Sequence, residues 1–330
     1  MVAKLPAPLV ECHAHVCPDA AWRRFPGGDS PRLVTAEHRV LGRMLEAHDG
    51  AGVTHALVSD SFFMEVSAEE LPGWAPMDRA RLYNDALADL VAAHPGRLYG
   101  LGCVDPFAGE AAAHELERMV TTLGFAGALV NPSDGGVRYL DDPACEPLLA
   151  AAAALGRPLF VHPSRDLPAD EHYRDFVLSL MVGRPAQTAV CAARLVLTGA
   201  LDRHPTLPLL LAHGGGVLPW VAGRVDATWA SYRPARWHGP DVLTQPPSRY
   251  LRRFHVDTNT WSAPALRLLL EVLGPDRLLV GNDQPPVWFP LGESLALLDA
   301  LALSARDAEA VRWRNAARLF RLPVAASVPA

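Results

Sequence analysis

Two histidines one residue apart are the first feature of this sequence that could do chemistry. His13 and His15 lie in the stretch VECHAHVCP, which begins like a β-strand. Side chains alternate along a strand, so both imidazoles point to the same side and can share one metal ion. Three further polar residues each follow an apolar run: His162 in PLFVHPS, His213 in LLLAHGGG and Asp283 in LLVGNDQP.

Imidazoles and a carboxylate in this pattern are typical ligands of a divalent metal. A set of three nitrogen ligands and one oxygen suits zinc and leaves a position for water or substrate. Manganese, cobalt and iron accept the same donors, so the ligand types leave the ion open. Each residue also has an ordinary alternative: a buried histidine can bind a neighbouring carbonyl, and Asp283 can cap the segment after it. The metal site is favoured because the polar residues coincide at four strand ends.

Eight short apolar runs alternate with stretches of helical periodicity along the 330 residues. This alternation predicts a (β/α)8 barrel, in which active sites lie at the carboxyl ends of the strands. A doubly wound open sheet is the alternative, but no GxGxxG motif follows the first run, which disfavours a dinucleotide site. The predicted strands are Leu9–Val16, Thr54–Ser59, Leu98–Val104, Gly127–Val130, Pro158–Val161, Leu207–Ala212, Phe254–Thr258 and Arg277–Val280. Predicted helices include Met77–His94, Ala111–Leu123, Glu146–Leu155, Ala186–His204 and Ala263–Leu273.

Composition narrows the domain organisation and the class of partner. No linker-like segment interrupts residues 1–330, which predicts a single domain. The formal net charge is −6 without a basic stripe, so we expect a small-molecule partner and no nucleic acid. The first residues lack a signal-peptide pattern and no apolar run reaches the roughly 20 residues of a membrane span. We therefore expect a cytoplasmic protein without membrane contact. Five cysteines without a CxxC pair suit a reducing compartment: Cys12, Cys17, Cys103, Cys145 and Cys191.

Several motifs, taken together and in this order, resemble one known family. HxH, VHP, AHGGG followed by LPW and GR, and finally GxD are similar to the amidohydrolase superfamily. The closest resemblance is to the branch that contains α-amino-β-carboxymuconate-ε-semialdehyde decarboxylase. It is densest over Val182–Arg224 and returns in LGPDRLLVGNDQPPVWFPLGE.

The resemblance implies a role for each candidate residue. His13, His15, His162 and Asp283 would bind a single divalent metal, most simply zinc. His213 would act as acid or base beside it, with Asp283 as a second catalytic group. Arg224 would hold a substrate carboxylate across the interface of a homodimer. The implied reaction is nonoxidative decarboxylation of an unsaturated or aromatic carboxylic acid without an organic cofactor. A metal-dependent hydrolase or hydratase, and a noncatalytic ligand-binding barrel, are the alternatives.

The sequence also differs from related patterns. Enzymes of the superfamily with two metals bridge them by a modified lysine on strand four, but Lys4 is the only lysine and Asn131 follows the fourth run. We therefore predict one metal ion per chain. Leu180 stands where the branch has a tryptophan, and a longer final loop places Trp288 and Phe289 near the barrel mouth. Arginines that could follow strand one are Arg23, Arg24 and Arg43. Histidines away from strand ends, His255 among them, receive no role.

Overall fold

Eight parallel strands form the centre of the molecule. The computed structural model describes residues 7–22, 41–60, 73–163, 167, 170–233, 239, 241–284 and 289–324. The strands are hydrogen-bonded in chain order, from β1 to β8. Every strand lies within the range predicted for it from the sequence, so the predicted barrel is confirmed. The strands are β1 (Val10–His15), β2 (His55–Ser59), β3 (Leu98–Cys103), β4 (Gly127–Val130), β5 (Leu159–Val161), β6 (Leu209–Leu211), β7 (Phe254–Asp257) and β8 (Leu278–Leu279).

Backbone hydrogen bonds join β1 to β8 and the segment after it. Cys12 donates its N–H to the carbonyl of Val280 at 2.8 Å, and Asp283 donates to the carbonyl of His13 at 2.8 Å. His15 donates to Gln284 at 2.7 Å. The first and last strands are therefore neighbours. This closure brings the histidine pair of β1 beside Asp283, although the two lie at opposite ends of the sequence.

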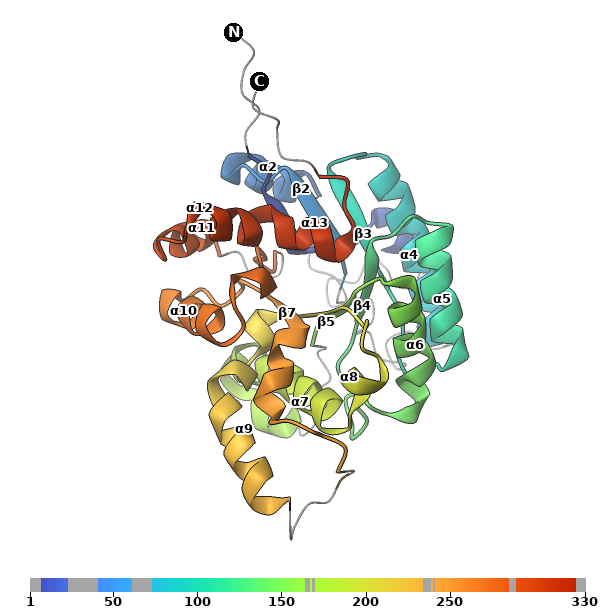
Figure 1. The fold of residues 1–330 in the computed structure, drawn as a ribbon. Coiled ribbons are helices and arrows are strands. Elements are labelled where there is room, and N and C mark those ends of the chain that lie inside the picture. The colour runs from blue at the N-terminus through green and yellow to red at the C-terminus, as the bar shows by residue number, and fades with distance from the viewer. Residues whose placement is uncertain are drawn as a thin grey trace.

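Helices surround the strands (Figure 1). Because helices cover the outside and side chains fill the inside of such a barrel, its strands are buried on both faces and mostly apolar, with the polar residues of β1 and β7 among the exceptions. All residues of β1, β4, β5, β6 and β7 are buried. The helices are α1 (Asp19–Trp22), α2 (Leu41–Ala51), α4 (Pro76–Ala92), α5 (Glu110–Thr121), α6 (Glu146–Leu155), α7 (Arg184–Leu197), α8 (Ala200–Arg203), α9 (Leu218–Tyr232), α10 (Ala263–Val272), α11 (Leu291–Asp299), α12 (Ala305–Glu309) and α13 (Asn315–Phe320).

One predicted helix is two helices in the structure. The sequence predicts a continuous helix over Ala186–His204, but α7 ends at Leu197 and α8 begins at Ala200. Gly199 between them has a φ of 73°, in the left-handed region that ends helices. A side chain at this position would also meet Val242. The apolar periodicity continues across the break, which is why the sequence pattern did not reveal it.

The sequence predicts no apolar run as long as a membrane span, and the segment Asp175–Leu197 corrects this expectation. By its length and composition this helical segment could cross a membrane, and its mean hydropathy is 1.3. In the structure the segment is not a straight helix, because Phe176 has a φ of 55°. Its last part, α7, buries Cys191 and Leu195 completely in the core. The apolar character of α7 is thus accounted for by its packing in the barrel.

Candidate metal centre

Four strand ends bring the predicted polar residues together. His13 Nε2 lies 3.2 Å from His15 Nε2. Asp283 Oδ1 lies 3.1 Å from His13 Nε2 and 2.9 Å from His15 Nε2. His162 Nε2 is 3.9 Å from the same oxygen, and His213 Nε2 is 3.2 Å from Oδ2. The five residues therefore surround one point at the carboxyl end of the barrel, as the sequence predicts.

Burial separates these five residues into an inner group and one outer residue. The side chains of His13, His15 and His162 are at most 1% exposed, whereas that of His213 is 16% exposed. Ligand atoms of His13, His162, His213 and Asp283 nevertheless all lie within 4.8 Å of one another. His213 is thus near enough to the others to be a ligand, although the resemblance assigns it the role of acid or base. The greater exposure of His213 favours the role of acid or base, because that role requires access to substrate.

The donor set fits a divalent cation. Both ring nitrogens of His162 are buried and have no hydrogen-bond partner among the described residues. A buried polar atom without a partner costs free energy, and a cation at this point would remove that cost. The Nε2 atoms of His13 and His15 also face one another, and only a shared proton or a bound cation makes that contact favourable. Imidazoles and a carboxylate are the donors that zinc and related ions accept.

Asp257 is a residue of the site that the sequence reasoning missed. It ends β7, and its Oδ2 lies 2.6 Å from His13 Nδ1. Its Oδ1 accepts the backbone N–H groups of Gly214 at 2.9 Å and Asn259 at 3.2 Å. The carboxylate therefore holds the proton of His13 on Nδ1 and turns the Nε2 lone pair toward the other donors. A polar residue at the end of the apolar run FHV is the same signal that identified the other four strand ends.

The two aspartates set the protonation of the cluster. Burial alone would lower the pKa of His13, but the carboxylates of Asp283 and Asp257 outweigh it and raise the pKa to about 10. At His162 burial dominates and lowers the pKa well below the usual value, so the ring is neutral. Burial would raise the pKa of Asp283, but its histidine neighbours, His13 first, hold it well below the usual range. A cation bound here would displace the His13 proton and meet an ionised carboxylate.

The backbone at two of these residues is in a conformation that few side chains adopt. His213 has a φ of 56° and Asp283 a φ of 61°. Such conformations cost of order 1–3 kcal/mol and persist only where the surroundings hold them. Gly214, beside His213, donates to Asp257, and the N–H of Asp283 donates to the carbonyl of His13. The barrel closure and the Asp257 carboxylate thus hold both residues in place.

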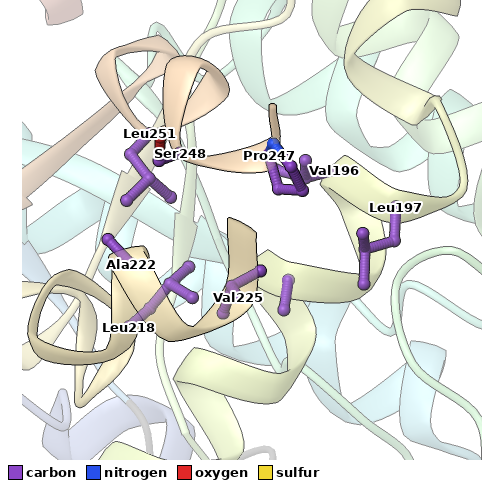
Figure 2. A pocket seen from close by; sticks show the side chains of 9 residues that line it. Val196, Leu197, Leu218, Ala222, Val225, Pro247, Ser248 and Leu251 are labelled. Atoms are coloured by element: carbon purple, nitrogen blue, oxygen red, sulfur yellow. The ribbon is translucent and has the colours of Figure 1, made fainter. Parts of the chain in front are cut away.

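Arg224 does not join the cluster within its own chain. It is exposed on α9, and nearby Asp226 accepts the N–H and hydroxyl of Ser248. The inner face of α9 lines an apolar crevice with α7 and residues 247–251 (Figure 2). Its volume of about 10 Å³ admits a single water at most, so it is no substrate site.

The structure places some of the other residues that the sequence analysis named near the barrel mouth. Phe289 stacks on Trp261 with ring centroids 5.3 Å apart. Its carbonyl accepts the side-chain amides of Asn282 and Gln284, each at 2.8 Å, so the segment after Asp283 is anchored beside the site. Arg43 is exposed on α2, and Leu180 is 39% exposed. Outside the described residues lie Arg23, Arg24 and Trp288.

Comparisons with known proteins find decarboxylases. The gamma-resorcylate decarboxylase of Rhodococcus jostii is 33% identical over 264 residues, which cover 74% of this chain and 77% of that protein. The 2-amino-3-carboxymuconate-6-semialdehyde decarboxylase of Dictyostelium discoideum is 31% identical over 225 residues, covering 66% of this chain and 58% of that protein.

A solved structure extends the similarity over the whole barrel. The dihydroxybenzoic acid decarboxylase of Polaromonas sp. JS666, with bound manganese and the inhibitor 2-nitroresorcinol, is 25% identical with a TM-score of 0.78. The match covers 97% of this chain and 98% of that one. The family model described as Amidohydrolase matches residues 10–322. With its barrel and its cluster of histidines and aspartate at the carboxyl ends of the strands, this chain belongs to the amidohydrolase family.

Proposed function

We propose that this protein is a metal-dependent nonoxidative decarboxylase of an aromatic or unsaturated carboxylic acid. The observation that carries the proposal is the buried cluster of His13, His15, His162 and Asp283 with His213 beside it, in a chain whose curated relatives are decarboxylases. The protein is accordingly a carboxy-lyase. It needs no organic cofactor, because a metal and an acid suffice for the reaction.

One divalent ion is held by His13, His15, His162 and Asp283. When bound, the ion polarises a substrate oxygen and so favours transfer of electron density toward it. Zinc is our first choice because three imidazoles and one carboxylate suit it. Manganese is the competing choice, since the Polaromonas relative contains it. Asn131 follows β4 in the position where a bridging lysine would be needed for a second ion, which supports one ion per chain.

His213 supplies the proton that replaces carbon dioxide. The bond between the substrate carbon and its carboxylate carbon breaks, the electron pair remains on that carbon, and the proton from His213 Nε2 forms the new C–H bond. Asp283 Oδ2, 3.2 Å from His213 Nε2, stabilises the protonated ring before transfer. The proton from His213 neutralises the carbanionic character that develops on the substrate carbon.

The active unit is a homodimer in which Arg224 serves the neighbouring chain. Arg224 lies on the outer face of α9, too far along the helix to turn back to its own barrel mouth. Near it, Trp220 is 80% exposed and Val217 is 45% exposed. The segment preceding α7 exposes Phe176 and Met181 as well. Large exposed apolar side chains are typical of a surface that a second chain covers. An arginine fork there is suited to a substrate carboxylate.

A cytoplasmic location belongs to the same proposal. It is supported by the cysteines, which are all buried and free. Fusion to a fluorescent protein and fractionation of cells would test it, and recovery in an extracellular or membrane fraction would contradict it.

Product analysis tests the function directly. Purified protein loaded with zinc or manganese is incubated with gamma-resorcylate and a panel of related hydroxybenzoates, and carbon dioxide is measured. We expect release of one carbon dioxide per molecule of acid consumed, with one deuteron on the product carbon when the reaction runs in D₂O. Addition of water to the substrate without carbon dioxide release would instead identify a hydratase or hydrolase. Elemental analysis that finds two ions per chain would contradict the single-ion site.

A further inference from the structure

A cavity of about 380 Å³ opens at the end of the barrel opposite to the metal centre. Its wall includes Pro208 immediately before β6, His255 at the start of β7 and Arg277 immediately before β8. The last helix, α13, contributes Arg318, and Arg321 follows that helix. All of these residues lie near the amino-terminal ends of the strands. The cavity is therefore separated from the candidate active site by the length of the barrel.

Positive charge dominates this cavity. Three guanidinium groups line it, from Arg277, Arg318 and Arg321, against the single carboxylate of Asp276. Asp276 Oδ2 lies 3.3 Å from Arg277 Nε and so neutralises one arginine. The remaining two arginines have no carboxylate partner within the described chain. Both are exposed to solvent, and their like charges favour an anion that enters between them.

The contacts of the two remaining arginines leave their donors available. Arg318 Nη2 donates only weakly, at 3.2 Å to the neutral amide oxygen of Asn315 and at 3.3 Å to the carbonyl of Asp276. The backbone N–H of Arg321 donates to the carbonyl of Ala317, but its guanidinium has no hydrogen bond and no ion pair among the described residues. A fourth arginine, Arg157, is close enough that burial and then the charge of Arg321 lower its pKa. The cavity thus has guanidinium N–H donors and positive charge that the contacts within the protein do not satisfy.

His255 adds a buried polar group to the cavity wall. It is 8% exposed, and its Nδ1 atom is buried with no hydrogen-bond partner among the described residues. Its Nε2 atom lies 3.5 Å from Arg277 Nη1. Because that nitrogen has no surface accessible to solvent, a ligand in the cavity does not reach it, and the arginines supply the binding groups.

We propose that this cavity is a second binding site, for a small phosphate-type oxyanion such as inorganic phosphate or a phosphorylated metabolite. Guanidinium forks match the geometry of phosphate oxygens, and bidentate pairs of this kind are among the stronger hydrogen bonds of proteins. The volume lies at the lower end of the roughly 300–1,000 Å³ of small-molecule sites. An anion that binds only the folded protein stabilises it by an amount that grows with the logarithm of its concentration above the dissociation constant. The site acts on stability, since it lies far from the reacting groups.

Thermal unfolding of the full-length, metal-loaded protein tests the proposal. Inorganic phosphate is titrated against sodium chloride at equal ionic strength and constant pH. We expect the Tm to rise with the logarithm of the phosphate concentration once that exceeds the dissociation constant, and chloride to leave the Tm nearly unchanged. The double variant Arg318→Gln/Arg321→Gln should bind phosphate at least tenfold more weakly, while its basal decarboxylase activity shows that it is folded. The matched control Arg314→Gln removes an exposed arginine that pairs with Glu309 outside the cavity, and it should respond as the wild type does.

A further arm separates this site from the metal centre, which could also attract phosphate. The variant Asp283→Asn should keep the phosphate-dependent rise in Tm, because its cavity is unchanged. Loss of the rise in Asp283→Asn with retention in the double arginine variant would overturn the proposal and assign phosphate to the metal centre. Equal shifts with chloride would overturn it as well, since simple screening would then explain them. Phosphorus NMR on the same proteins, with line broadening reversed by the double substitution, would support it.

Discussion

The contact between His13 and Asp257 determines how the candidate metal centre is built. A histidine can present either ring nitrogen to a metal, and the group bound to the other nitrogen decides which. In His13, Nδ1 lies 2.6 Å from Asp257 Oδ2 and is hydrogen-bonded to it, so Nε2 is the atom that faces His15 and Asp283. The same carboxylate binds the N–H of Gly214 beside His213. One buried aspartate thus orients both a ligand and the residue next to the proposed acid.

Asp257→Asn is expected to weaken metal binding by about 10–100-fold, the usual effect of losing a group that orients a ligand. The amide is nearly the same size, but it cannot accept both contacts and it lowers the basicity of His13. The dissociation constant is measured by competition with a chelator. The control Asp226→Asn changes an aspartate that binds Ser248 away from the metal centre and should leave the affinity unchanged. Equal affinities in all three proteins would mean that Asp257 does not orient the ligand.

Substitution of two neighbouring histidines should separate binding from catalysis. We expect His213→Ala to keep nearly one ion per chain while its turnover falls by about 100-fold or more, the range for a lost general acid. His162→Ala should lose the ion, because its buried nitrogens face the other donors. Metal content by elemental analysis and turnover by carbon dioxide release are measured on both. Similar metal loss in the two variants would make His213 a ligand.

The turn after β6 is the element that places His213. Gly214, Gly215 and Gly216 all have positive φ values, of 63°, 77° and 64°. This conformation reverses the chain directly after the strand and lets α9 begin at Leu218. Glycine is required because a side chain would be strained and, at Gly216, would meet the carbonyl oxygen of Pro185 in α7. The glycines of the AHGGG motif are therefore a requirement of the backbone in this turn.

Two glycine-to-alanine substitutions should have opposite effects on stability. Gly216→Ala is expected to lower the free energy of unfolding by about 2 kcal/mol or more, from strain and overpacking together. Gly50→Ala lies in helix α2 with nothing near the added methyl group, so it should leave stability unchanged or raise it by up to about 1 kcal/mol. Urea unfolding of both variants gives the comparison. A stable Gly216→Ala protein would show that the turn tolerates a side chain.

Strand β7 carries a titrating group at its amino end. Burial, and then the charges of Arg277 and Arg318, lower the pKa of His255 to about 4 in the folded protein. In the unfolded chain the usual value of about 6.5 returns. Between pH 6.5 and pH 4 the unfolded state therefore binds more protons at this histidine than the folded state does. The free energy of unfolding is thus highest above pH 6.5 and decreases as the pH falls toward 4. The loss amounts to at most roughly 3 kcal/mol.

The variant His255→Asn should lose this part of the pH dependence. Unfolding free energies are measured between pH 7 and 4 in buffers without phosphate, and the slope of the variant is subtracted from that of the wild type. The control His114→Asn changes a histidine exposed on α5 and should follow the wild type. Parallel slopes for wild type and His255→Asn would show that His255 does not resist protonation.

At the scale of the whole molecule, the proposal that Arg224 serves a neighbouring chain requires two chains for one complete site. Arg224→Ala and His213→Ala are each expected to be nearly inactive alone. Mixed under conditions that exchange subunits, they should recover up to about a quarter of the wild-type activity per site, since half of the dimers are then hybrids and one site in each hybrid keeps both residues. Exchange is verified with differently tagged chains. Absence of recovery after proven exchange would return Arg224 to a surface role in its own chain.

The positions of the strands and of most candidate site residues were determined by local patterns in the sequence. The eight strands follow from short apolar runs, because a strand buried on both faces needs apolar residues throughout. Four of the strand ends identified His13, His15, His162, His213 and Asp283, since a polar residue that follows a buried run needs a specific partner. The motifs around them also indicated the amidohydrolase family before any distance was known.

Only the tertiary structure decided which groups meet. Asp257 was visible as a polar strand end, but its contact with His13 depends on barrel closure, which joins residues 244 positions apart. The break at Gly199 depends on a backbone angle that apolar periodicity does not record. The charge at the opposite end of the barrel was likewise hidden, because Arg277, Arg318 and Arg321 are unremarkable in the sequence and converge only when α13 packs against β8. The individual contacts between distant segments are set by packing geometry, and a linear pattern that predicts the barrel does not specify which side chains touch within it.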